Sequence, residues 1–194
     1  MKAARLLVSL LGTFLLVGAA MAADAPPAAA AAAAKPAVAK APPLPRVTMQ
    51  EMMRGIYFPA ANVVFSAQDD ITKYPQADDP STSPNPLTSV YGGWLAVENA
   101  SLALLDARTL LDRPGRLCSN KRVVPVQSEQ WKAFSRLMSD AAVAAYKAAQ
   151  TKDTDKMVDV AGTLTDACDA CHKVFRDRDV PGKPAGTKDI CPAT

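Results

Sequence analysis

The sequence contains a single histidine among its 194 residues, and aromatic residues make up only 6% of it. Without a second histidine we can propose no nucleophile–base pair for covalent catalysis, and the acidic residues are scattered over predicted polar faces. No basic stripe with interleaved aromatic residues is present, which argues against nucleic-acid binding. We therefore expect neither an enzyme nor a nucleic-acid-binding protein.

Long hydrophobic runs are also lacking beyond the N-terminus. One run extends from Leu6 to Ala20 after Lys2 and Arg5, and it is too short to span a bilayer comfortably, because a spanning helix needs about 20 residues. The positive start, the apolar run and the small residues at Ala20-Met21-Ala22 are the three parts of a secretory signal. We predict a signal peptide over 1–22, export to the periplasm and no stable membrane span; an uncleaved N-terminal anchor is the alternative.

Residues 23–46 contain almost only Ala, Pro and Lys. They cannot bury apolar area, and repeated prolines prevent a continuous helix, so we predict a disordered linker here and one domain over 47–194. The domain holds 17 basic and 18 acidic residues once six N-terminal charges are set aside (Lys2, Arg5, Asp24, Lys35, Lys40 and Arg46). It is therefore close to neutral, although the whole chain has a formal charge of +3.

Strand patterns are scarce in the predicted domain, whereas apolar residues recur at steps of three and four, as in helices. We predict a first helix from Thr48 to about Ala67, with Thr48 and Glu51 as a capping box and a kink at Pro59. Its apolar stripe comprises Met49, Met52, Met53, Ile56, Val63 and Val64.

Three further amphipathic stretches follow the first. They predict helices over about 87–111, 128–150 and 155–178, and Ser128 is the expected N-cap of the third helix. Trp94 and Trp131 lie on apolar stripes and are expected in the core. We predict an all-α fold, an antiparallel four-helix bundle.

Cys168-Asp169-Ala170-Cys171-His172 is the most informative stretch of the sequence. Cys-x-x-Cys-His is the attachment signature of c-type haem, and on a helix these three side chains share one face. We predict one covalently attached haem c, with thioether bonds to Cys168 and Cys171 and with His172 as an axial ligand of the iron. Such a haem needs an apolar cavity against Cys168, Cys171 and His172.

Three other interpretations of this motif stay open. A thioredoxin-type redox pair requires a βαβ context, which the sequence lacks. A structural zinc site needs four Cys or His ligands, which the chain could supply only by adding Cys118 or Cys191. The motif could also occur by chance, in a helical interaction module without haem that a metal or a disulfide stabilises. Export favours haem, because two unmodified thiols in an oxidising compartment normally form a disulfide.

The motif lies in the last predicted helix, and Phe175 and Arg176 follow it. This Cys-x-x-Cys-His-x-x-Phe-Arg arrangement and the segment 52–62 of the first helix resemble the class II c-type cytochromes, the cytochrome c′ and cytochrome c-556 group, over about 47–178. The resemblance implies a four-helix bundle with haem between the helices near one end, and often a homodimer built on the first two helices.

The resemblance also bears on the two residues after the motif. It implies that Arg176 lies beside the proximal imidazole; pairing with a haem propionate, or a solvated position near the helix end, are the alternatives. Phe175 is expected either on the haem or in the core.

The second axial position of the iron distinguishes the two types within this group. In the cytochrome c′ type an apolar residue of the first helix covers that face, so that NO or CO can bind. In the c-556 type a Met of the same helix ligates the iron, which raises its potential and suits one-electron transfer. Met53 best matches the family pattern, with Met52 and Met49 as alternatives, although Met is also a common core residue. We predict electron transfer with redox partner proteins, and gas binding as the second function.

Two cysteines, Cys118 and Cys191, lie outside the motif. Both fall in predicted loops, and two leftover thiols of an exported chain seldom stay free. We predict a disulfide between them, which would tie the C-terminal tail to the connection between the second and third helices.

Overall fold

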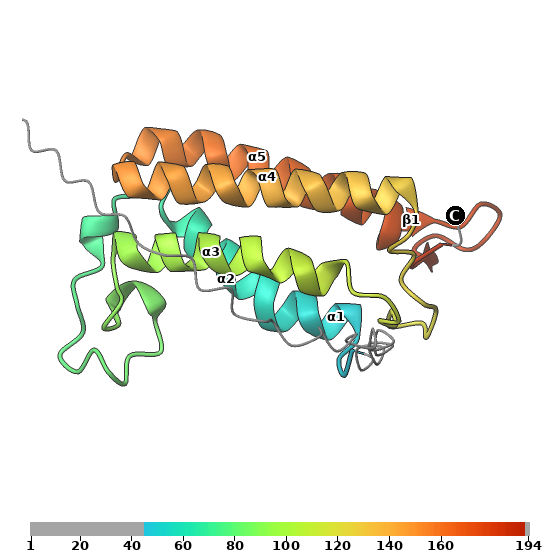
Figure 1. Ribbon diagram of the computed structural model, residues 1–194, viewed down its shortest axis with the longest axis horizontal. Coiled ribbons are helices and arrows are strands. Elements are labelled where there is room, and N and C mark those ends of the chain that lie inside the picture. The colour runs from blue at the N-terminus through green and yellow to red at the C-terminus, as the bar shows by residue number, and fades with distance from the viewer. Residues whose placement is uncertain (1–44, 193–194) are drawn as a thin grey trace, which may run out of the picture. The chain divides into compact units, whose positions relative to one another are not determined.

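The computed structural model describes residues 45–192 of the chain. The predicted signal peptide and nearly all of the predicted linker lie outside the described residues. Most of the described residues are helical, which agrees with the predicted all-α class (Figure 1). No helix within 45–192 is long and apolar enough to cross a membrane.

The N-terminal helical segment consists of α1 (Met49–Met52), the π-helical turn η1 (Met53–Tyr57) and α2 (Phe58–Ser66). The predicted capping box at its start is confirmed. The Glu51 amide donates to Thr48 Oγ1 at 3.2 Å, and the Thr48 amide donates to Glu51 Oε2 at 2.8 Å. The π-helical turn ends two residues before Pro59, which has no amide hydrogen to continue an α-helical ladder. The predicted interruption is therefore a local change of helix type.

The π-helical turn changes which residues face the core. Its hydrogen bonds span five residues instead of four, as in the bond from the Phe58 amide to the Met53 carbonyl. The spacing in sequence between one buried residue and the next is accordingly five once, from Met52 to Tyr57, and shorter afterwards. The buried residues of the segment are Met52, Tyr57, Ala60, Ala61, Val64 and Ala67. Ile56 and Val63, both on the predicted apolar stripe, are only partly buried.

The predicted start of the second helix at Leu87 is wrong. The structure has a short 3₁₀ turn, η3 (Pro86–Thr88), and α3 (Trp94–Leu111) begins only after Gly92 and Gly93. Gly93 has a φ of 60°, and a Cβ at Gly92 would lie 2.5 Å from the carbonyl oxygen of Leu87. The chain bends here in a way that only glycine tolerates, so a continuous helix cannot form.

The last two helices are α4 (Glu129–Thr151) and α5 (Thr154–Phe175). Ser128 is the N-cap of α4, as predicted, and its Oγ accepts from the Trp131 amide at 3.2 Å. α5 ends before the predicted Arg178, because β1 (Arg178–Asp179) and β2 (Lys188–Asp189) form an antiparallel ladder there. Two-residue strands are too short for the alternation that marks a strand in sequence, so this ladder was missed.

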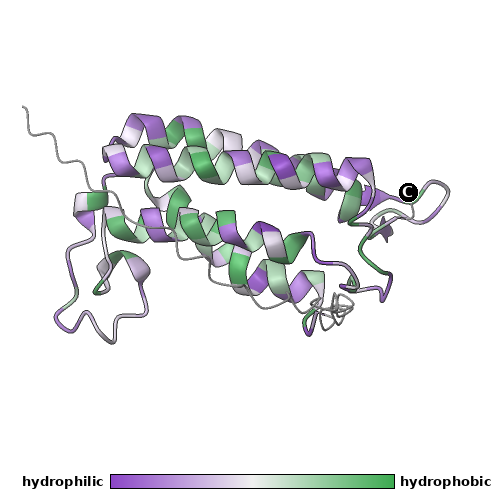
Figure 2. Ribbon diagram, in the orientation of Figure 1, coloured by the Kyte–Doolittle hydropathy of each residue, from purple (hydrophilic) through white to green (hydrophobic). Residues whose placement is uncertain are grey.

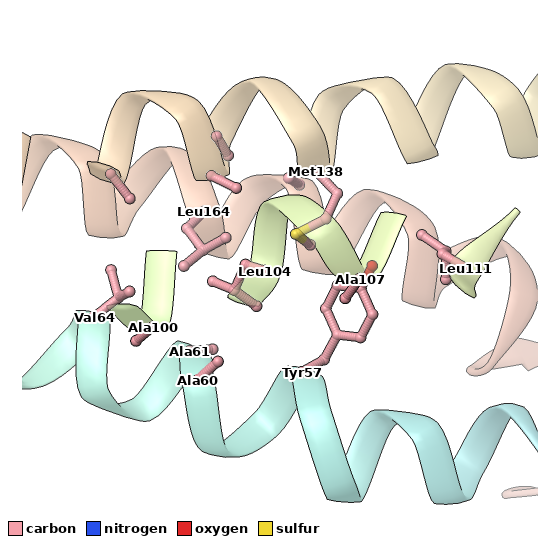
Figure 3. Close-up of a cluster of buried hydrophobic side chains, with 14 of the residues drawn as sticks. Tyr57, Ala60, Ala61, Val64, Ala100, Leu104, Ala107, Leu111, Met138 and Leu164 are labelled. Carbon is pink, nitrogen blue, oxygen red and sulfur yellow. The ribbon is translucent and has the colours of Figure 1, made fainter. Parts of the chain in front are cut away.

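Each helix packs against its neighbours through a face that runs along its length. α2 contacts α3, α3 contacts α4, α4 contacts α5, and α2 also contacts α5. Apolar and polar residues are interspersed along every helix (Figure 2). The buried apolar residues pack together between the helices (Figure 3). Each long helix contributes to this cluster, with Val64 from α2, Leu104 from α3, Met138 from α4 and Leu164 from α5.

Candidate functional site

The three residues of the motif lie together near the C-terminal end of α5. Cys168, Cys171 and His172 are spaced by three and four residues, so the helix brings them to one face. All three are partly buried, and both thiols are free. The His172 carbonyl accepts from the amides of Arg176 and Asp177, which ends the helix directly behind the motif.

A cavity of about 460 Å³ lies against these three side chains. Its lining is predominantly apolar and comes from α1, η1, α2, α3, α4, α5 and the C-terminal tail. Several of the core residues in Figure 3, Tyr57, Leu104, Met138 and Leu164, form its inner wall. The prediction of an apolar cavity against Cys168, Cys171 and His172 is thus confirmed.

The three candidate methionines differ in their positions in the structure. Met49 and Met53, one turn apart, both line the cavity and are partly buried. Met52 does not line it and is only 2% exposed, packed in the core. The structure therefore brings two of the three thioethers to the cavity that holds His172.

Burial is the main influence on the pKa values of the two thiols and the imidazole of the motif. It raises the pKa of the Cys168 thiol, with a further contribution from Asp169, and it raises the pKa of Cys171 to about 12, with a further contribution from Cys168. It lowers the pKa of His172, and the nearby Arg176 guanidinium lowers it further. Near neutral pH the thiols are protonated and the imidazole is neutral, the form in which histidine ligates metals.

The residues after the motif take different positions. Phe175 is buried and lines the cavity, with its ring centroid 4.9 Å from that of Trp131 and 6.1 Å from that of Phe134. Arg176 is exposed at the cavity rim, and its Nε donates to the two carboxylate oxygens of Asp177 at 2.8 and 2.9 Å. Trp131, expected in the core, is buried and also lines the cavity.

The C-terminal tail closes one end of the cavity. A disulfide joins Cys118 to Cys191, with Cα atoms 6.4 Å apart, and both cysteines line the cavity. The Cys191 amide donates to the Phe175 carbonyl at 2.8 Å, and Asn120 Nδ2 donates to the Ile190 carbonyl at 2.6 Å. The tail is thereby held against both α5 and the loop that precedes α4.

Tyr57 is a buried cavity residue that the sequence interpretation did not include. Its side chain is 6% exposed and lines the cavity, and its hydroxyl has no hydrogen-bond partner. Tyr57 lies four residues after Met53 and seven before Val64, so α-helical spacing already places it beside members of the predicted stripe. That spacing was the signal that could have identified Tyr57.

The structure provides little support for the interpretation of the motif as a zinc site. Within residues 45–192, no three or more His, Cys, Asp or Glu side chains are grouped so as to hold a metal ion. Cys118 and Cys191, the additional ligands that such a site would need, are bonded to each other.

No protein-family model matches this chain, and no curated protein and no solved structure matches it significantly.

Proposed function

We propose that this protein is a periplasmic monohaem c-type cytochrome that transfers single electrons. In this proposal the helices form an antiparallel four-helix bundle, with haem attached to Cys168 and Cys171 and with His172 as axial ligand. The observation that carries the proposal is the shared cavity, which these three residues line together with Met49 and Met53. Its volume of about 460 Å³ lies in the usual range for cofactor sites, about 300–1,000 Å³.

The two thiols fit covalent attachment. The sulfur of each thiol would bond to one carbon of a vinyl group, and the thiol proton would go to the other vinyl carbon. Both thiols are free and face the same cavity, so the two bonds can form to one planar group. Because burial raises the pKa of both thiols, they are weak nucleophiles by themselves, which is consistent with attachment by dedicated machinery.

The neutral imidazole of His172 and a methionine thioether would ligate the iron. When bound, haem supplies one-electron redox chemistry at a potential that the axial ligands and the burial of the iron set. We assign the second axial position to Met53, with Met49 as the alternative. Met52 is the weaker alternative, because it is packed in the core. The apolar lining would exclude water, and Arg176 at the rim is available to a propionate.

The test is haem attachment in the full-length chain. Expressed in a bacterium with haem-attachment machinery, the protein should give a band that stains for haem after denaturing electrophoresis, because thioether bonds survive denaturation. The double variant Cys168→Ala/Cys171→Ala should not stain. Asp169→Ala is the matched control, because Asp169 lies between the two cysteines and is exposed, and it should keep the stain.

An unstained wild-type band would end this proposal and leave a helical interaction module without haem. A homodimer and partner redox proteins, which the resemblance and the function imply, remain predictions.

Binding of a small gas such as NO or CO is the second candidate function. It is favoured by the predominantly apolar lining of the cavity, since apolar cavities take up small uncharged molecules. In that case the iron would be five-coordinate at rest, and neither Met49 nor Met53 would ligate it.

A further inference from the structure

The charges of the domain are distributed unevenly along the helices. The loop 67–93, between α2 and α3, contains four acidic residues and one basic residue. The basic loop, residues 113–128 between α3 and α4, contains four basic residues and no acidic one. The post-motif segment, residues 173–192, contains five basic and three acidic residues. In Figure 1 the basic loop and the post-motif segment lie at one end of the helices, and the loop 67–93 lies at the other end. A nearly neutral domain therefore has a basic end and an acidic end.

The basic end is the one that carries the cavity. Both the basic loop and the post-motif segment contribute to the cavity lining. Asn120 Nδ2 donates to the Ile190 carbonyl at 2.6 Å, which joins these two segments. The Met49 amide donates to the Leu117 carbonyl at 2.8 Å, which joins the basic loop to the start of α1. The positive charges of both segments therefore lie beside the cavity.

The carboxylates of the post-motif segment are all engaged in ion pairs. These pairs are Asp177 with Arg176, Asp179 with Lys188, and Asp189 with Arg122 of the basic loop. Lys173, Arg178 and Lys183 are exposed and form no ion pair within the described part of the chain. The same holds for Lys121 of the basic loop. This end therefore presents cations to the solvent whose charge no neighbouring carboxylate neutralises.

Arg116 of the basic loop adds a buried positive charge. Its side chain is 3% exposed, and its guanidinium donates to the carbonyls of Val47 at 2.7 Å and Leu110 at 3.0 Å. No carboxylate among residues 45–192 forms an ion pair with it. Because salt screens a buried charge less than an exposed one, Arg116 keeps this end positive at physiological ionic strength.

The basic loop also exposes apolar side chains. Leu117 is 41% exposed and Val123 is 60% exposed, and the two residues are opposite each other in an isolated antiparallel bridge. Residues directly opposite in such a bridge carry their side chains on one face. Protein–protein interfaces combine an apolar centre with a polar rim. The basic loop thus offers an apolar contact beside its cations.

We propose that the basic loop and the post-motif segment form the docking surface for a redox partner protein whose own docking face is acidic. This inference rests on the proposed function, because the surface lies beside the cavity that would hold the haem. Opposite charges raise the rate at which two proteins meet and fix their relative orientation. A protein is favoured over an anionic membrane, because electrons would pass through this end and because the exposed apolar pair suits a protein interface.

The first test measures electron transfer from the reduced holoprotein to hexacyanoferrate(III), a small anion. The haem iron loses one electron and becomes Fe(III), and the probe becomes hexacyanoferrate(II). Lys121→Glu should lower the second-order rate constant by about 3- to 10-fold at an ionic strength of about 0.1 M. The difference should vanish at about 1 M, where the charges are screened within a few ångströms.

Lys152→Glu is the matched control. Lys152 is also exposed, forms no ion pair within 45–192 and has a left-handed backbone, with a φ of 55° against 67° for Lys121. It follows the C-terminal end of α4, roughly 30 Å along that helix from its start at Glu129. Both substitutions change the net charge equally, so an effect of net charge alone would be the same in both. Lys152→Glu should leave the rate unchanged, and equal losses in the two variants would overturn the proposal.

The second test uses a protein probe, an acidic flavodoxin. The reduced flavin loses one electron, and the Fe(III) of the holoprotein gains it, at a rate that Lys121→Glu should lower and Lys152→Glu should not. The same variants are sedimented with vesicles that contain phosphatidylglycerol. If Lys121→Glu weakens vesicle binding and leaves the flavodoxin rate unchanged, the surface binds membranes and the proposal is wrong.

Chemical-shift mapping distinguishes failure of this inference from failure of the proposed function, because it needs no haem. Oxidised flavodoxin, added to the isotope-labelled full-length chain as purified, should shift the amide signals of the basic loop and the post-motif segment. Such shifts in a chain that does not stain for haem would retain the acidic partner and refute only the haem. Shifts confined to the loop 67–93, or no shifts at all, would refute the docking surface even in a chain that stains.

Discussion

Met49 and Met53 of the first helical segment line the cavity. Substituting them tests the proposed iron ligand at the scale of single residues. Met53→Leu should remove the sulfur-to-iron band from the spectrum of the oxidised holoprotein and lower its reduction potential, because Met ligation raises the potential. Met52→Leu is the matched control, since Leu and Met have similar volumes and Met52 is packed in the core. It should leave both measurements unchanged.

Other outcomes of the same spectra assign the ligand differently. Loss of the band in Met49→Leu but not in Met53→Leu identifies Met49 as the ligand. A high-spin band near the red end of the wild-type spectrum, with no sulfur-to-iron band, excludes every methionine and favours the gas-binding function.

Sequence reasoning succeeds for single residues where their meeting on one face depends on local spacing. Cys168, Cys171 and His172 meet on one face because a regular helix brings residues three and four apart together. Tyr57 lies four residues after Met53 and seven before Val64, so the same spacing would have placed it beside the predicted stripe. The choice between Met52 and Met53 depends on packing, since both belong to the predicted stripe and only Met53 lines the cavity.

At the scale of secondary-structure elements, the capping box of α1 holds the segment that carries both cavity methionines. Thr48→Ala removes the acceptor of the Glu51 amide and should reduce the free energy of unfolding by about 1 kcal/mol. Thr48→Ser retains a hydroxyl at the N-cap and should keep most of the stability. Urea unfolding of the holoprotein, followed by circular dichroism, measures both. Equal losses in the two variants would show that the hydroxyl does not stabilise the helix.

Element boundaries were predictable where a side chain sets them. Thr48 and Ser128 could be recognised as N-caps because their hydroxyls accept from amides of the first turn. The start of α3 depends instead on the close approach of Gly92 to the Leu87 carbonyl, which is a contact within the folded loop. The end of α5 coincides with the pairing of β1 and β2, and neither strand has a pattern of its own.

At the scale of the whole molecule, periodicity predicts helices but not the space between them. The cavity is lined by α1, η1, α2, α3, α4, α5 and the tail, so its volume depends on how all of these pack. The sequence indicated that a cavity should exist at the motif. Nothing in the polar, proline-containing sequence of the tail predicted that the tail closes one end of the cavity.

The disulfide between Cys118 and Cys191 is the covalent link of that tail to the rest of the domain. The two residues are 73 positions apart in the sequence, so the bond closes a long loop. In the chain-entropy account such a bond restricts the unfolded state, which corresponds to about 4 kcal/mol for a loop of this size. Cys118→Ser/Cys191→Ser should therefore lower the free energy of unfolding of the holoprotein by up to about that amount.

Reductant provides the internal control for this last prediction. A thiol reductant should lower the urea midpoint of the wild type to that of the double variant and leave the variant itself unchanged. Equal midpoints for wild type and variant without reductant would mean that the hydrogen bonds from Asn120 and Cys191 and the ion pair of Arg122 with Asp189 hold the tail alone.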